Sequence, residues 1–229
     1  MHQNLFIEDQ QTLMRDYFLN ELAQHGTIKH YNKRQTITAD PVSMSIGIVV
    51  KGQVTISVIS SKGQEKILYT LLPGECFGEM NLLSDSFFNY IIKVKKNTWI
   101  SFVHNKKFNL ILKNNPAVYQ YFINVIIIKF RIVLLQMVSN IFNNSAGKIA
   151  DTLLRLSLAS VPLKNSPADN NTIAIPFTQG ELANITGCSR ITVTRILNQF
   201  INKNFISISN KKIIIKNPEA LLQQSIHLQ

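Results

Sequence analysis

The chain has 229 residues, a length typical of one or two domains, and 45% of them are hydrophobic, which excludes wholesale disorder. Charged residues make up only 16%, yet 24 Lys and Arg face 13 Asp and Glu, giving a formal net charge of +11. This imbalance favours an anionic partner, either nucleic acid or an acidic membrane surface. Two cysteines, Cys76 and Cys188, exclude a disulfide-rich scaffold and a four-thiolate metal site.

Neither a secretory signal nor a membrane span is expected. The first 17 residues carry three acids and lack an apolar core. The apolar stretch 117–138 contains Lys129 and Arg131 near its middle, whereas a span needs about 20 mostly apolar residues with few or no charges. We therefore expect a cytoplasmic protein in which this stretch is a buried helix.

Residues 27–105 have the pattern of an all-β sandwich or jelly roll, flanked by helices at Leu5–His25 and Asn105–Asn114. Apolar, β-branched or alternating segments predict five strands, at Ile46–Val50, Val54–Ser60, Glu65–Leu72, Phe88–Val94 and Thr98–Val103. Turn-like sequences separate them at Lys51–Gln53, Ser61–Gln64, Pro73–Glu75 and Lys95–Asn97.

A long helix is predicted to begin at Pro116. Its apolar residues recur at alternating spacings of four and three, as in the seam of a coiled coil: Tyr119, Ile123, Ile126, Phe130, Val133 and Met137. A second apolar row lies beside the seam, at Ile127, Leu134 and Ile141. We expect the seam to pack against a second chain and the second row against the chain's own β domain. A single amphipathic core helix is the alternative.

The segment from Asn143 to Gly147 breaks this pattern and is the predicted domain boundary. Beyond it we expect a helix at 148–160, a loop at 161–171 and a short strand at 172–176. Thr178 and Glu181 then have the spacing of a capping box that begins a helix through Ile185. After a turn at residues 186–188, Ser189 caps a second helix that runs to about Lys203. Two helices joined by a short turn containing glycine indicate a helix-turn-helix, and two short strands in 205–216 would form a wing.

The second helix of this motif has two different faces. Val193, Ile196, Leu197 and Phe200 should pack inward, whereas Arg190, Ile191, Thr194, Arg195 and Asn198 should face outward. Arginine on an outward face suits guanine, and hydroxyls and free amides at helix N-termini suit phosphate. The expected DNA-binding residues are Thr178, Ser189, Arg190, Ile191, Thr192, Thr194, Arg195, Lys211 and Lys212. An αα-hairpin with solvated arginines is the alternative interpretation.

Residues Gly187–Leu197 resemble the recognition motif of the cyclic-AMP receptor protein / fumarate-nitrate regulator (CRP/FNR) family. Residues Gly147–Leu154 are similar to the first helix of its DNA domain, and Gly74–Met80 to its β-roll effector loop. The resemblance implies an α+β fold with a β-roll effector domain at 1–115, a dimerisation helix at 116–144 and a winged helix-turn-helix at 145–229. It further implies a cytoplasmic homodimer that binds palindromic double-stranded DNA and a small-molecule effector, and contacts RNA polymerase. An activator is expected, and repression stays open as the alternative.

The effector region departs from the cyclic-nucleotide sensors of the family. Asn89 and Tyr90 stand where those sensors have the Arg-Ser or Arg-Thr that holds a phosphate. Val133 and Leu134 replace the helix hydroxyls that read adenine. We therefore expect an aromatic or anionic effector instead of cyclic AMP, as in the branch that senses halogenated aromatics. The candidate effector residues are Gly78, Glu79, Phe88, Asn89, Tyr90, Lys129, Arg131 and Val133.

Other possibilities follow from the same residues. Glu79 would alternatively cap its loop, the aromatic residues would be core, and the two cations would reach solvent. Redox sensing through Cys76 and effector-independent DNA binding also remain open. No iron–sulfur cluster or haem is expected, because residues 1–75 lack cysteine and no histidine lies between Tyr31 and Val103. The enzyme motifs G-x-S-x-G, G-x-x-x-x-G-K and H-E-x-x-H are absent, so neither catalysis nor a metal site is predicted.

A second departure concerns sequence readout. The family usually has a glutamate directly after the position of Arg190, where it accepts a hydrogen bond from cytosine, but this chain has Ile191. Isoleucine cannot accept that bond, although it can contact a thymine methyl group. We therefore expect half-sites richer in A/T, with centres about 10 bp apart.

Overall fold

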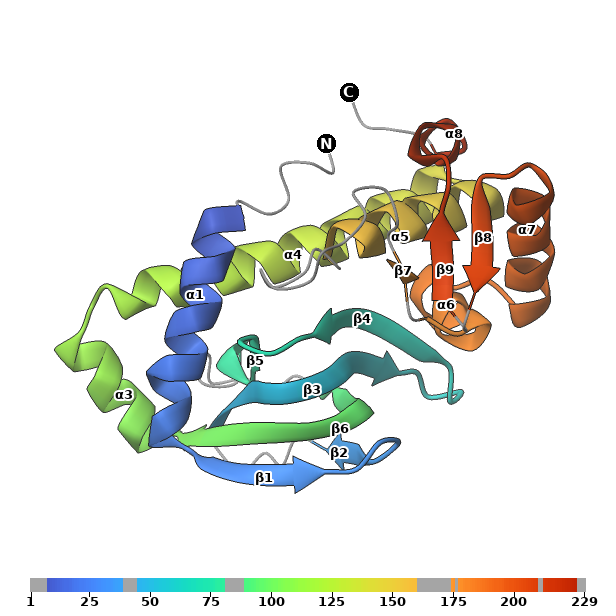
Figure 1. The fold of residues 1–229 in the computed structure, drawn as a ribbon. Helices are drawn as coiled ribbons and strands as arrows, with labels where there is room; N and C mark the ends of the chain where they lie inside the picture. Colours follow the sequence, from blue (N-terminus) through green and yellow to red (C-terminus); the bar gives the residue numbers. More distant parts are fainter. Residues whose placement is uncertain are drawn as a thin grey trace. The chain divides into compact units, whose positions relative to one another are not determined.

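The computed structural model describes residues 8–38, 45–80, 89–159, 174–175, 177–209 and 212–225. The chain forms two compact units, which meet in sequence between Phe130 and Arg131, and each is described by itself (Figure 1). The first unit is mainly an antiparallel sheet with helices before and after it, and the second combines helices with a small sheet. These elements confirm the predicted fold class of a β-sheet domain, a long helix and a helix-turn-helix.

The first unit contains a six-stranded antiparallel sheet in which β1, β6, β3 and β4 are neighbours in that order. Strand β2 pairs with β6, and the short strand β5 pairs with β3. The strands are β1 (Thr27–Tyr31), β2 (Thr36–Thr38), β3 (Ser45–Ile59), β4 (Glu65–Leu71), β5 (Cys76–Phe77) and β6 (Ile91–His104). Their inward residues, including Val49, Val54, Ile56, Ile92 and Ile100, form one buried cluster.

Two of the predicted turns are wrong. Strand β3 runs through Lys51–Gln53, and β6 runs through Lys95–Asn97, with register shifts between the two strands at this level. Gly52 has φ of +99° and a Cβ there would collide with the Thr98 hydroxyl, so glycine is required within the strand. A β-bulge and a hairpin turn use the same residue types, and only the pairing of the distant strand distinguishes them.

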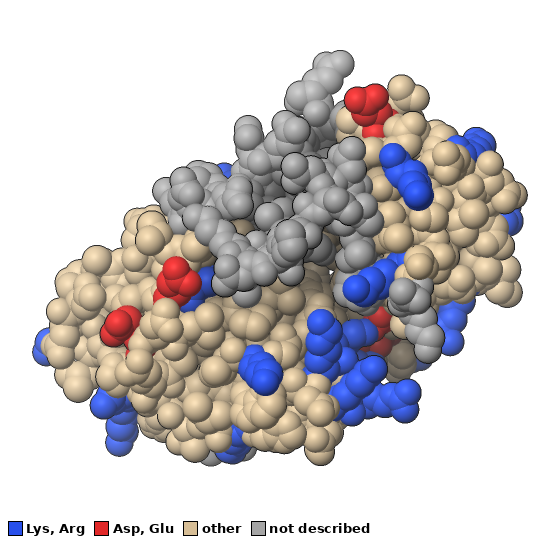
Figure 2. Space-filling view, viewed as in Figure 1, with Lys and Arg blue, Asp and Glu red and all other residues tan. Residues whose placement is uncertain are grey.

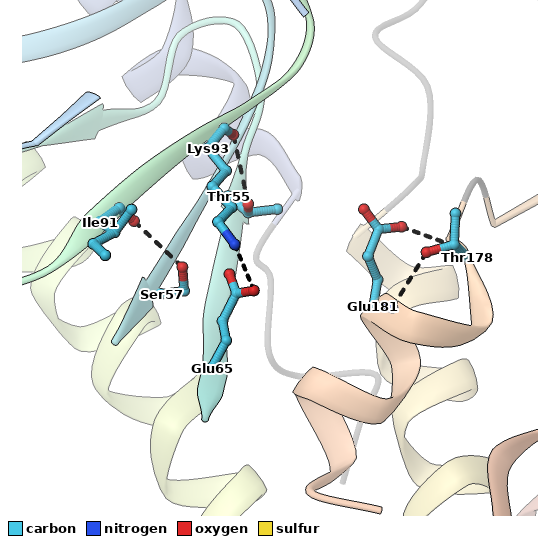
Figure 3. Close-up of polar contacts among 7 residues, drawn as sticks. All are labelled: Thr55, Ser57, Glu65, Ile91, Lys93, Thr178 and Glu181. Atoms are coloured by element: carbon cyan, nitrogen blue, oxygen red, sulfur yellow. Dashed lines mark hydrogen bonds and ion pairs between the residues drawn. The ribbon is translucent and has the colours of Figure 1, made fainter. Parts of the chain in front are cut away.

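The other two predicted turns are confirmed. Gly63, with φ of +76°, closes the β3–β4 hairpin, and Gly74, with φ of +82°, precedes β5. Side chains add support between β3, β4 and β6, as Figure 3 shows. The hydroxyls of Thr55 and Ser57 each lie 3.5 Å from a carbonyl oxygen of β6, and Lys93 contacts Glu65 at 2.6 Å.

Helices pack with the sheet around a second buried cluster. They are α1 (Glu8–Asn20), the 3-10 turn η2 (Leu22–His25), α3 (Asn105–Asn114) and the first part of α4 (Val118–Phe142). Phe18, Phe108 and Phe122, from α1, α3 and α4, lie at the centre of this cluster beside Cys76. The helix predicted at Asn105–Asn114 is confirmed at both ends.

Helix α4 buries a different row from the one that the sequence indicated. Val118, Phe122 and Val125 pack into the sheet domain, whereas the predicted second row, Ile127, Leu134 and Ile141, is exposed. The seam row is exposed as well: Tyr119, Ile123, Ile126, Phe130, Val133 and Met137. The long helix is therefore apolar almost all around, and a pattern of apolar positions could not decide which side faces the sheet. By length and composition, α4 is also a candidate membrane span, which is weak evidence because core helices have the same character.

The described residues of the second unit form four further helices and a three-stranded sheet of order β7–β9–β8. Its elements are α5 (Ser145–Ala159), β7 (Ala174–Ile175), α6 (Gln179–Thr186), α7 (Arg190–Asn202), β8 (Ile206–Ser209), β9 (Lys212–Ile215) and α8 (Pro218–Leu222). Helix α5 contacts α6, α7 and α8, and thus forms the base on which the helix pair rests. The predicted loop at 161–171 lies outside the described residues.

Candidate functional site

The predicted helix-turn-helix is formed by α6 and α7, and each helix begins with the expected cap. The Thr178 hydroxyl accepts from the Glu181 amide at 3.2 Å, and the Glu181 carboxylate accepts from the Thr178 amide at 2.8 Å (Figure 3). Gly187 ends α6 in the left-handed conformation, with φ of 72°. The Ser189 hydroxyl then accepts from the Thr192 amide at 3.1 Å and starts α7. Local signals in the sequence therefore fix both helix starts and the turn between them.

Helix α7 divides into the two predicted faces. Val193, Ile196, Leu197 and Phe200 are buried. Arg190, Ile191, Arg195 and Asn198 are exposed, and Ile191 stands out because 82% of its surface is accessible. This isoleucine lies on the same exposed helix face as the two arginines, so apolar and cationic side chains are presented together. This face is the candidate DNA-binding surface.

The hydroxyl groups near this face are already engaged within the protein. Thr194 donates to the Gln179 side chain at 2.7 Å and lies 2.9 Å from the Arg190 carbonyl. The hydroxyls of Ser189 and Thr192 are 2.9 Å apart and share a hydrogen bond. These hydrogen bonds hold the helix starts in place, and the contact of these hydroxyls with DNA stays a prediction.

Two residues of the site were missed by sequence reasoning. Gln179 joins α6 to α7 through Thr194, and Gly180 lies against the Arg190 guanidinium, so that a Cβ there would be 3.2 Å from Nε. Glycine inside the first turn of a helix destabilises the helix relative to alanine. Its presence at position 180 was therefore a signal in the sequence that another group lies close to the backbone there. Gly180 thus allows the Arg190 guanidinium to approach the first turn of α6.

The wing of the motif is formed by β8 and β9, as predicted. Lys212 is exposed at the start of β9, and Lys211 lies outside the described residues. Lys203, at the end of α7, packs over the Phe205 ring with Nζ 5.8 Å from the centroid. On the face drawn in Figure 2, Lys and Arg side chains are far more abundant than Asp and Glu. Residues 145–229 hold nine Lys and Arg against four Asp and Glu, so the candidate surface belongs to a basic domain.

The predicted effector residues Glu79 and Lys129 form a buried ion pair in the sheet unit. The Lys129 Nζ lies 2.7 Å from Glu79 Oε1 and donates to the Cys76 carbonyl at 2.8 Å. It also lies 5.3 Å from the centroid of the Tyr69 ring, a cation–π contact that the sequence did not indicate. Only 2% of the Glu79 side chain and 12% of the Lys129 side chain are exposed. The loop before Glu79 turns at Gly78, whose φ is +93°.

Ionisation around this pair follows from burial and charge. Burial alone would lower the pKa of Lys129, but the Glu79 carboxylate outweighs it, with help from Tyr69 and Cys76, and the net shift is upward. Burial, followed by the Glu79 charge, raises the pKa of Tyr90, and burial raises the pKa of the Cys76 thiol to about 12. At neutral pH the site therefore holds an ammonium, neutral phenols and a neutral thiol.

Four other candidate effector residues are not part of this buried ion pair. Asn89 is exposed, Phe88 lies outside the described residues, and Arg131 and Val133 are exposed on the part of α4 that belongs to the second unit. The second carboxylate oxygen of Glu79 is buried and has no hydrogen-bond partner within the described part of the chain. The sequence thus identified both Glu79 and Lys129 as candidates but not that they pair with each other. Tyr69 was missed because nothing in its strand marks it.

The absence of a cofactor stays a prediction. Among the described residues, no group of three or more His, Cys, Asp and Glu is placed to hold a metal ion. Cys76 is fully buried and Cys188 is half-buried at the turn before α7.

Comparison with known proteins agrees with both parts of this description. Residues 28–115 match the cyclic nucleotide-binding domain family, and residues 147–224 match the Crp-like helix-turn-helix domain. The chain is 28% identical over 208 residues to the cAMP-activated global transcriptional regulator CRP of Haemophilus influenzae, covering 90% of this chain and 91% of the relative.

Solved structures share the fold at lower identity. FixK2 from Bradyrhizobium japonicum is 19% identical with a TM-score of 0.75, and the match covers 89% of this chain and 99% of that one. CprK in complex with OCPA is 20% identical with a TM-score of 0.70, covering 90% and 93%. At this identity the likeness concerns the fold alone.

Proposed function

Because the chain belongs to the CRP/FNR family of DNA-binding transcription regulators, we propose that it acts as a homodimer on a palindromic, A/T-rich DNA site. Each recognition helix α7 would enter the major groove of one half-site, and the wing would contact the backbone. The protein would work in the cytoplasm as an activator that contacts RNA polymerase. Its effector would be a small aromatic or anionic molecule other than cyclic AMP.

The observation that carries the DNA part of the proposal is the outward face of α7. Arg190 and Arg195 are exposed on it, and between them Ile191 presents an apolar side chain that is 82% accessible. Arginine pairs bidentately with guanine, while an apolar side chain in the same groove favours the thymine methyl group. A glutamate at 191 would instead accept from cytosine, which is why the isoleucine supports an A/T-richer half-site.

The exposed apolar row of α4 supports the dimer. Six seam residues at heptad-like spacing are accessible, among them Phe130, of which 64% is exposed. A continuous apolar seam in water is covered most economically by the same seam of a second chain, which also gives the two-fold symmetry that a palindrome requires.

The effector part rests on Tyr90 and Asn89, which offer neither a guanidinium nor a fixed positive charge for a phosphate. The half-buried rings of Tyr90 and Tyr69 offer aromatic surface near Lys129. Because Lys129 is already paired with Glu79, the head of an anionic effector would have to compete with that carboxylate or engage Arg131.

Selection of bound sequences from random double-stranded DNA tests the proposal. We expect enrichment of a two-fold symmetric site whose half-sites are about 10 bp apart and A/T-rich next to the arginine contacts. Ile191→Glu is the matched variant, because it changes readout without touching the buried face, and it should move the selected half-site toward G·C. Enrichment of the same G·C-containing core by both proteins would contradict the assigned role of Ile191. Absence of enrichment both for the purified protein and for the protein in cell extract would contradict the function.

A further inference from the structure

The ion pair between Lys129 and Glu79 lies where the family places its effector loop, yet both of its members belong to the chain. We propose that this pair is an internal latch that takes the place of an effector, so that the ligand-free protein is the DNA-binding form. The inference rests on the proposed function and adds its regulation. An effector would then act on a protein that is already competent to bind DNA.

The first argument is that groups of the chain itself surround the Lys129 ammonium. An ammonium group has three N–H donors. Two of them are used by the Cys76 carbonyl at 2.8 Å and Glu79 Oε1 at 2.7 Å, and the Tyr69 ring lies on a third side at 5.3 Å. Two hydrogen bonds and one cation–π contact, all from groups of the chain itself, therefore hold the Lys129 ammonium in place.

The second argument is the position of the pair in the fold. Cys76 pairs with Ile48 of β3, so the carbonyl that holds Lys129 is fixed to the sheet. Glu79 follows three residues later, after the turn at Gly78. Lys129 itself precedes Phe130, whose side chain is exposed in the proposed dimer seam. The ion pair therefore ties the sheet directly to the segment of α4 that would meet the second chain.

The third argument is the cost of opening the pair. Glu79 is 2% exposed, and its second oxygen already lacks a partner in the described part of the chain. Removing Lys129 from it would leave a buried carboxylate without its cation, which is strongly unfavourable. The closed pair is thus the stable state of the ligand-free protein. For a change in DNA affinity to follow, the latched and open states must differ in their fit to DNA.

The test measures binding of the ligand-free protein to a DNA duplex obtained by the selection described above. Native mass spectrometry first confirms that no small molecule accompanies the purified wild type. We expect Lys129→Met and Glu79→Gln each to weaken DNA binding about tenfold, a usual size for coupling between two sites. The double variant should bind no more weakly than either single variant, since both remove the same contact. Cyclic AMP at 1 mM should leave the affinity of the wild type unchanged.

Lys93→Met is the matched control. Lys93 also pairs with a glutamate, Glu65, at 2.6 Å in the same sheet, but its side chain is 40% exposed. Its loss should leave DNA affinity unchanged. Circular dichroism and thermal unfolding identify any variant that fails to fold. If Lys129→Met fails to fold, the test rests on Glu79→Gln, which keeps the size and shape of the side chain.

Several results would overturn the latch. The first is that the folded single variants bind DNA as tightly as the wild type. The second is that cyclic AMP strengthens DNA binding by the wild type. The third is that protein in cell extract enriches DNA sites whereas the ligand-free protein does not. The last result would leave the proposed function intact. If neither preparation enriches any DNA sequence, the proposed function itself fails.

Discussion

Two pairs of cations in this protein differ in what surrounds them. On α7, Arg190 and Arg195 are exposed on one helix face beside an exposed isoleucine. In the sheet unit, Arg15 pairs with Glu75 and Lys129 pairs with Glu79, and these side chains are nearly buried. The first group faces outward and is available to an anionic partner, whereas the second satisfies acids inside the chain.

This difference shows that the net charge of the chain is weak evidence for a DNA-binding surface. The net charge of +11 is divided almost evenly, because residues 1–144 hold 15 Lys and Arg against nine Asp and Glu. Counting therefore cannot separate a DNA-binding surface from cations that stabilise the fold. Burial and pairing identify, residue by residue, the cations that stabilise the fold, and the DNA-binding unit also holds one of these at Arg155. Substituting one cation of each group tests the distinction.

The largest effect is expected at Arg155, which lies on α5 under the helix pair. Its Nε is 3.7 Å from the Asp151 carboxylate, it donates to Thr152 at 3.2 Å, and only 6% of the side chain is exposed. Arg155→Met removes a cation paired with Asp151 and should lower the free energy of unfolding by about 3 kcal/mol. Urea denaturation measures this. The double variant Asp151→Asn, Arg155→Met should recover part of the loss, and an unchanged midpoint in the single variant would show that the pair is not structural.

A smaller loss, in binding and not in stability, is expected at Arg195. Arg195→Ala removes an exposed side chain and should weaken specific DNA binding by about 1–3 kcal/mol if the contact to a base is bidentate. Fluorescence anisotropy at several salt concentrations gives both the affinity and the salt slope. Lys203 lies at the end of the same helix against Phe205, so Lys203→Ala is the control and should change the affinity for DNA little. Equal losses of DNA affinity in the two variants would mean that α7 binds DNA through its charge without specific contacts to the bases.

The helix-turn-helix could be predicted from the sequence because its signals are local. The Thr178–Glu181 spacing, Gly187 and Ser189 fix the helix starts and the turn within a dozen residues. The sheet was predicted less well where its structure depends on distant residues. The kink at Gly52 resembles a turn in sequence, and only pairing of β3 with β6 shows that the strand continues.

The candidate sites show the same limit. The outward residues of α7 follow from helical periodicity, so the amino-acid sequence is sufficient to identify them. Lys129 was recognisable as a cation in an apolar helix, but its partners Glu79 and Cys76 are about 50 residues away. The choice of buried row on α4 also depends on the sheet that covers it, because apolar residues surround the helix.

A more modest effect is expected at Thr178, which caps the first helix of the DNA-binding motif. Thr178→Ala removes the oxygen that accepts from the Glu181 amide at 3.2 Å and should lower the free energy of unfolding by about 1 kcal/mol. Thr178→Ser keeps that oxygen and should be close to the wild type. If both variants lose the same amount, the methyl group and not the cap is responsible.

The smallest effect concerns the two thiols and decides whether Cys76 can be a redox switch. Cys76 is fully buried, and burial raises the pKa of its thiol to about 12, so almost no thiolate exists at neutral pH. Cys188 is half-buried at the turn before α7. In the native protein we expect a disulfide reagent such as DTNB to modify Cys188 and spare Cys76 until the chain is unfolded. Cys188→Ala isolates the second thiol. Rapid labelling of Cys76 in that folded variant would revive redox sensing, whereas protection means that Cys76 serves as a small core residue whose carbonyl holds Lys129.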